Sequence, residues 1–230
     1  MSMRPLNFLA GLVLTAALAG CGGNGETADE PTTGNGAVST ATPGPATTAA
    51  PEAERYSQKD LRKSLLALDD MPEAGFTVSE VDESRERTYY CDYEPPVEPT
   101  EVASSEFEKI EGLAFFLVRS NVDQFASAED AAAQIDKAAE VLETCRESEI
   151  DGVKQTYAVM SAPEMGEDTL AVKIEMTLDD IDVVMHQFYV LSGTAVLQTS
   201  TAAGGMSFPD ASVGAELAAR QLEKYEALSG

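Results

Sequence analysis

The stretch "TLAVKIEMTL", residues 169–178, decides the fold predicted for this chain. Every second residue is apolar, and the positions between them include Lys173 and Glu175. A period of two residues is typical of a β-strand that buries one face and exposes the other. The residues expected to face inward are Leu170, Val172, Ile174, Met176 and Leu178.

Further strands are predicted on both sides of this one. "VKQTYAVM" (153–160) precedes it, and "VVMHQFYVL" (183–191) and "TAVLQTST" (194–201) follow it, with a tight hairpin turn at Ser192-Gly193. Adjacent strands joined by short turns form antiparallel sheets.

The upstream half predicts fewer strands. "EGLAFFLVRSNV" (111–122) is apolar on both faces, which suits a central strand covered on both sides. "GFTVSEV" (75–81), with Phe76 and Val78 alternating, and "TYYCDYEPP" (88–96) predict two short, weak extended segments.

Three helices are expected. "SQKDLRKSLLALDD" (57–70) begins with capping-box spacing and is expected to bury its leucines, Leu68 included. Ser127 with Asp130 repeats that spacing and opens an alanine-rich helix that runs to about Arg146 and turns Cys145 toward the core. A last helix starts at Asp210. Its expected buried side carries Ala211, Ala215, Ala218, Leu222 and Tyr225.

This order of elements predicts a single α+β domain over residues 56–230. Its antiparallel sheet should have about five to seven strands flanked by three helices. No internal repeat is visible.

The first residues predict a signal peptide, residues 1–20. The uncharged run Leu6 to Ala19 is too short, at about 21 Å as a helix, to cross a hydrocarbon core of about 30 Å. Leu18-Ala19-Gly20-Cys21 resembles the lipobox of bacterial lipoproteins, which implies a lipid on Cys21. Residues 21–55, rich in Thr, Ala, Pro and Gly, predict a disordered tether.

The chain is strongly acidic, with a formal net charge of −25. Binding of nucleic acid needs clustered Lys and Arg, so we expect no nucleic-acid partner. We expect the protein to lie at the extracytoplasmic face of the cell membrane, held there by the lipid.

Two cysteines remain, Cys91 and Cys145. In an exported protein such a pair indicates a disulfide, with two separate buried thiols as the alternative.

"LLALDDMPEAGFTV", residues 65–78, resembles the start of actinobacterial cell-envelope sensor domains. This group includes the PknH-like extracellular sensor domains of mycobacterial serine/threonine kinases, and a related architecture is the Mog1/PsbP-like fold. The resemblance implies an antiparallel sheet flanked by helices, a groove for an extracellular ligand, and a disulfide at positions such as those of Cys91 and Cys145.

No catalytic, metal or cofactor site is predicted. His186 is the only histidine, no Gly-x-Ser-x-Gly turn is present, and a structural or solvent-facing role is expected for this histidine. The acidic residues Asp179, Asp180 and Asp182 raise the alternative of a calcium loop, but Asp is also a common turn residue.

Two segments are candidate binding edges. Tyr89, Tyr90 and Tyr93 surround a disulfide half, and aromatic packing around that disulfide is the alternative interpretation. Gly204-Gly205 is the centre of a candidate lip, with a plain strand-to-helix connection as its alternative.

We therefore expect a non-enzymatic, lipid-anchored ligand-binding or sensor module. Its ligand would be a small molecule, a lipid or a cell-wall fragment. The alternatives are an accessory subunit that docks a membrane protein and, with the least support, a hydrolase.

Overall fold

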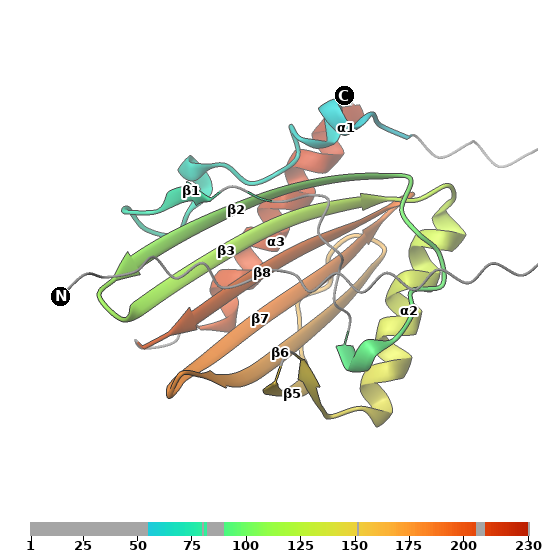
Figure 1. Ribbon diagram of the computed structural model, residues 1–230. Helices are drawn as coiled ribbons and strands as arrows, with labels where there is room; N and C mark the ends of the chain where they lie inside the picture. The colour runs from blue at the N-terminus through green and yellow to red at the C-terminus, as the bar shows by residue number, and fades with distance from the viewer. Residues whose placement is uncertain (1–54, 80, 82–89, 151, 206–209, 230) are drawn as a thin grey trace, which may run out of the picture. The chain divides into compact units, whose positions relative to one another are not determined.

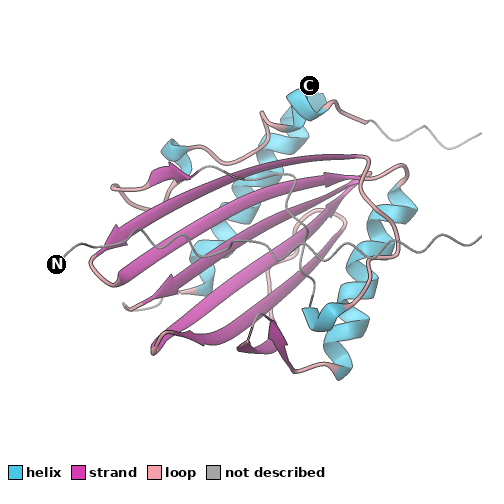
Figure 2. Cartoon of the chain, viewed as in Figure 1, coloured by secondary structure: helices cyan, strands magenta, loops and turns pink. Residues whose placement is uncertain are grey.

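The computed structural model describes residues 55–79, 81, 90–150, 152–205 and 210–229. The chain divides into two compact units, 1–48 and 49–230, and every described residue belongs to the second. Figure 2 shows its strands and helices. The predicted signal peptide, the lipid on Cys21 and the tether up to residue 54 lie outside the described residues.

A single antiparallel sheet of eight strands organises the described residues, in the order β1-β2-β3-β8-β7-β6-β5-β4 (Figure 1). The α+β class is confirmed, with more strands than expected. The strands are β1 (Thr77–Ser79), β2 (Glu101–Glu111), β3 (Ala114–Gln124), β4 (Glu147–Ile150), β5 (Val153–Met160), β6 (Asp168–Leu178), β7 (Ile181–Ser192) and β8 (Ala195–Gly204).

Helices pack on both faces of this sheet. The α-helices are α1 (Gln58–Leu61), α2 (Ala128–Thr144) and α3 (Ala211–Glu226), and short 3₁₀ turns are η1 (Leu68–Asp70), η2 (Tyr90–Asp92) and η3 (Ala227–Ser229). Consecutive residues of a strand point to opposite faces. Val190 packs in the cluster that holds α3, whereas Leu191 packs in the cluster that holds α2. We name the two sides of the sheet the α3 face and the α2 face, and Figure 1 shows the sheet between these helices.

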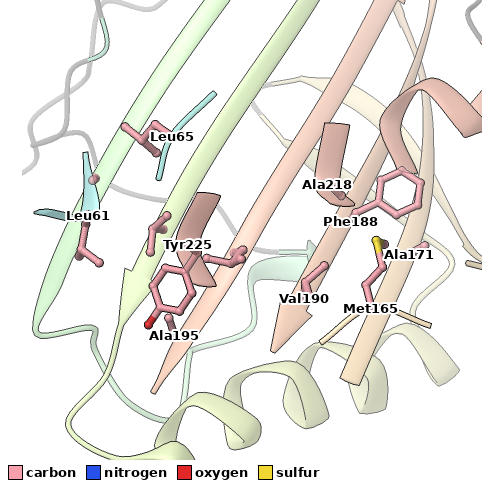
Figure 3. Close-up of a cluster of buried hydrophobic side chains, with 12 residues drawn as sticks. Leu61, Leu65, Met165, Ala171, Phe188, Val190, Ala195, Ala218 and Tyr225 are labelled. Atoms are coloured by element: carbon pink, nitrogen blue, oxygen red, sulfur yellow. The ribbon is translucent and has the colours of Figure 1, made fainter. Parts of the chain in front are cut away.

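The α3 face carries a large apolar cluster (Figure 3). Ala218 and Tyr225 of α3 belong to one cluster with Phe188 and Val190 of the sheet, and Leu61 joins from the N-terminal segment. Gly214 allows this close approach, because a Cβ there would lie 2.6 Å from the Phe188 ring.

A buried glutamine holds α3 on the sheet. Gln221, which is fully buried, accepts a hydrogen bond from the Thr199 hydroxyl (2.5 Å) and donates one to the Asn121 carbonyl oxygen (2.8 Å). Both polar ends of the amide are therefore paired in the core, where an unpaired polar group would cost about 1–3 kcal/mol.

The first helix is much shorter than predicted. α1 ends at Leu61, and the Ser64 hydroxyl donates to the Leu61 carbonyl oxygen (2.7 Å). The chain then unwinds so that Leu66 lies against the sheet, where its N–H donates to Ser120 Oγ (3.2 Å). Leu68, predicted to be buried, is 46% exposed.

Two strands were not expected, and one expected segment is not a strand. The sequence of β2 alternates poorly, because only Ala103 and Phe107 are buried in it, and β4 has only four residues. The residues of 88–96 that the structure describes form η2 and irregular chain, not an extended segment, because Cys91 adopts a positive φ of 53°. Val78, predicted to face inward, is 63% exposed.

The last helix begins at its predicted cap but buries a different side. Asp210 caps α3 by accepting from the Ser212 N–H (2.8 Å). The buried residues are Gly214, Leu217, Ala218, Gln221 and Tyr225, so glycine and glutamine interrupt the apolar periodicity of the buried side.

Cys145 is the C-cap of α2 rather than a helical core residue. Its disulfide with Cys91 is confirmed.

The β6–β7 turn is a two-residue hairpin at Asp179 and Asp180, whose φ angles are 48° and 66°. Positive φ at both positions is typical of a type I′ turn, which Gly tolerates better than Asp. We expect Asp180→Gly to raise the free energy of unfolding by about 0.5–1 kcal/mol, measured by urea denaturation. Gly193→Ala, at φ 57°, serves as the opposite case and should destabilise. A less stable Asp180→Gly variant would contradict this turn geometry.

The pKa of Asp70 makes stability depend on pH. Burial acts to raise this pKa, but hydrogen bonds from Lys224 and the Ala67 N–H and the charge of Lys224 outweigh it and hold the pKa below its ordinary value. A lowered native pKa adds stability above the unfolded pKa of about 3.9, and this stability is lost as pH falls through the native pKa.

Asp70→Asn should therefore lower stability at neutral pH by about 1–3 kcal/mol and reduce the loss of stability below about pH 4. Thermal unfolding followed across acidic pH measures both effects. Asp69→Asn removes the same charge from the neighbouring residue and should have little effect at neutral pH. If the two variants behave alike, the contact between η1 and α3 does not stabilise the fold.

Candidate functional site

A band of hydrogen-bonding side chains crosses the α2 face of the sheet. In antiparallel strands, directly paired residues lie on the same face. Two adjacent rows of such pairs run from β2 through β3 and β8 to β7, and nearly all their side chains are polar. We call this set the polar band; its members are Ser104, Glu106, Arg119, Asn121, Gln198, Ser200, Gln187 and Tyr189.

Hydrogen bonds link the β3 part of the band. Arg119 Nε donates to Asn121 Oδ1 (3.2 Å), and Asn121 Nδ2 donates to Gln198 Oε1 (3.3 Å). Within the part of the chain that the structure describes, the half-buried Arg119 forms no ion pair. Its remaining guanidinium N–H groups are available to a ligand. The carboxylate of Glu106, which is paired with Arg119 across the strands, faces the same side, as does that of Asp123, one row beyond Asn121.

A cluster of tyrosines lies at the β7 end of the band. The Tyr90 hydroxyl of η2 donates to Gln187 Oε1 and lies 2.6 Å from the Tyr189 hydroxyl. Its ring meets those of Tyr157 and Tyr189 edge-on, with centroids 5.3 and 6.3 Å apart. Burial, followed by the nearby Tyr189, raises the pKa of Tyr90 well above its ordinary value, so this phenol stays neutral.

The disulfide positions this cluster. Cys91 follows Tyr90 directly and is bonded to Cys145, which caps α2. Gln134 of α2 donates a hydrogen bond to the Tyr93 hydroxyl (3.2 Å). The buried Oε1 of Gln134 has no partner among the described residues. Tyr90 and Tyr93 therefore lie beside the polar band, held there by α2, with Tyr90 itself buried in packing.

Apolar rows continue the same face beyond the band. The next two rows hold Leu117, Ala202, Met185 and Ile174, then Phe115, Gly204, Val183 and Met176. Gly204 lies under Phe115, because a Cβ there would meet the ring at 2.6 Å. Ile174, Met176 and Met185 of these rows pack in the cluster that holds α2, and Ile174, Ala202 and Val183 are buried.

The structure does not bring the predicted edge residues together in one site. Tyr90 and Tyr93 lie beside the band, Gly204 packs at the far end of the same face, and Gly205 is exposed with φ 68°. Tyr89 and the residues that follow Gly205 up to 209 lie outside the described residues. Sequence reasoning did not identify the band itself. Its signal was present as polar residues two apart within apolar strands, such as Arg119 with Asn121.

No metal centre or membrane span is found in the described part of the chain. None of its His, Cys, Asp and Glu side chains form a group of three or more arranged to hold a metal ion. None of its helices combines the length and the apolar composition needed to cross a membrane.

Comparison with known proteins shows a likeness of fold. No family model matches the chain, and no curated protein matches it. Among solved structures, the crystal structure of the extracellular domain of PknH from Mycobacterium tuberculosis matches with a TM-score of 0.59 and 14% sequence identity. The match covers 76% of this chain and 100% of that domain. The described domain therefore has the fold of a PknH-like extracellular sensor domain.

Proposed function

We propose that this chain is a non-enzymatic, lipid-anchored sensor or ligand-binding module on the extracytoplasmic face of the membrane. The polar band is the observation that carries the proposal. Its side chains lie on a sheet face, and most of their donors and acceptors are not needed to join the strands, which backbone hydrogen bonds already do. A ligand with several hydrogen-bonding groups would engage them.

Other features support the same function. A solved structure with this fold is described as an extracellular domain, and the disulfide Cys91–Cys145 suits an oxidising compartment. The lipobox resemblance at Cys21 supplies an anchor, and the tether after it would give the domain reach from the membrane.

Native mass spectrometry tests the proposal on protein released from its own envelope, compared before and after denaturation. We expect an extra mass that is lost on denaturation. Arg119→Ala combined with Asn121→Ala should reduce the occupied fraction about tenfold or more, because two or more hydrogen bonds, one of them to a charged group, are removed.

The matched control is Lys137→Ala, which removes one positive charge from an exposed position of α2 away from the band. It should keep the extra mass. An apo mass for all three proteins would exclude tight carriage of an abundant ligand. Equal loss in the control would indicate a charge effect unrelated to the band.

A second function has its own support. Ile110 and Leu113, which are 63% and 83% exposed, lie at the β2–β3 hairpin, at the same end of the sheet as Leu178 of the β6–β7 hairpin. Exposed apolar side chains grouped at one end of a domain are typical of protein-contact sites. Docking of a membrane protein through this end is therefore the alternative, and cross-linking from Leu113 in intact cells would identify such a partner.

A further inference from the structure

The opposite face of the sheet carries a hollow that the proposed function does not use. It has a volume of about 480 Å³ and lies between the N-terminal half of α3 and the segment joining β5 to β6. Phe188 lies at its base, and Ala211, Ala215 and Ala219 of α3 and Pro163 of the connecting segment supply apolar walls. The size suits a small organic molecule.

The polar groups of this hollow are hydroxyls and carboxylates, and none of them carries a positive charge. They are the hydroxyls of Ser161 and Ser212 and the carboxylates of Asp210 and Glu216, and no Lys or Arg is found among the described residues that line the hollow. Carboxylates only accept hydrogen bonds and attract positive charge. Asp210 and Glu216 are six residues apart, so their backbones are about 9 Å apart along α3 and a small ligand can lie between the two charges.

His186 does not line the hollow, but it lies close enough to Asp210 for their charges to interact. It precedes Phe188 by two residues on the same face of β7, is 8% exposed, and makes no hydrogen bond within the described residues. Burial, followed by the charge of Lys173, lowers its pKa, while Asp210 and Glu175 act in the opposite direction. The imidazole is therefore mostly neutral at neutral pH and adds no positive charge beside Asp210.

The positive charge of Lys173 does not cancel the preference of the hollow for a cation. Lys173, which pairs with His186 across the strands, is bound to Glu175 (2.6 Å). The chain as a whole carries a formal charge of −25, which attracts cations toward any acidic hollow.

We propose that this hollow is a second binding site, for a small organic cation in which an ammonium or guanidinium group carries a short apolar chain. The cationic group binds between Asp210 and Glu216, and the apolar chain lies over Phe188 and the alanines of α3. This site is independent of the polar band, because the two lie on opposite faces of the sheet.

Three probes that share one alkyl chain test the charge preference: hexylammonium chloride, sodium hexanoate and hexanol. Each is titrated into the full ¹⁵N-labelled chain, and amide shifts are followed by NMR. Hexylammonium should shift the amides of Phe188 and residues 211–219 and bind at least about tenfold more tightly than hexanoate. Raising the salt concentration should weaken its binding.

Glu216→Gln removes one charge and keeps the shape of an exposed side chain, so it should weaken hexylammonium binding about threefold to tenfold. Asp210→Asn should do the same while it preserves the helix cap, since Asn caps as well as Asp. The matched control is Glu226→Gln on the same helix, about 15 Å from Glu216, which should leave the affinity unchanged.

Several results would overturn the proposal. These are equal binding of hexanol or hexanoate, shifts outside the hollow, no shifts with hexylammonium up to millimolar concentration, or equal effects of Glu216→Gln and Glu226→Gln. None of them bears on the polar band, whose own test uses Arg119 and Asn121.

Discussion

The structure depends on a sheet in which the two central strands bury both faces. Each residue of β7 and β8 must suit either the α3 layer or the α2 layer, and the choice alternates with every step along the strand. Val190 and Leu191 illustrate this, since the first packs with α3 and the second with α2. A shift of one residue in register would exchange the two layers, so packing on both sides fixes the register. The same alternation brings the polar band to one face and the hollow to the other.

Much of the sheet could be predicted because its strands are locally self-consistent. β6 alternates cleanly, and the turns that follow β6 and β7 carry residues suited to tight hairpins. β2 could not be predicted in this way, because its inward residues include Ala103 and Ser105 and its identity comes from pairing with β3. The first helix failed for a related reason. The backbone of Leu66 is bound by Ser120 and Ser105, residues distant in sequence, and these contacts replace helical hydrogen bonds.

The candidate site was harder to predict than the fold. The disulfide and the neighbourhood of Tyr90 could be inferred from residue types, since cysteines and tyrosines are informative in isolation. The polar band could not, because its members come from four strands and acquire meaning only through register. Gln221 shows the same limitation in the core. A glutamine inside an apolar helix face interrupts the pattern, and only the structure shows Thr199 and the Asn121 carbonyl as its partners.

The position of β8 has a consequence for how the chain reaches its native state. β8 is the last strand in the sequence, yet it lies between β3 and β7 and joins the β1–β3 part of the sheet to the β4–β7 part. Until residues 195–204 have been synthesised, β3 and β7 both present unpaired edges, which can pair with other chains. Closure by a late strand across distant segments also gives the domain a high contact order and slow folding. The sheet can therefore close only after almost the whole domain has been synthesised, and the incomplete chain needs protection from association until then.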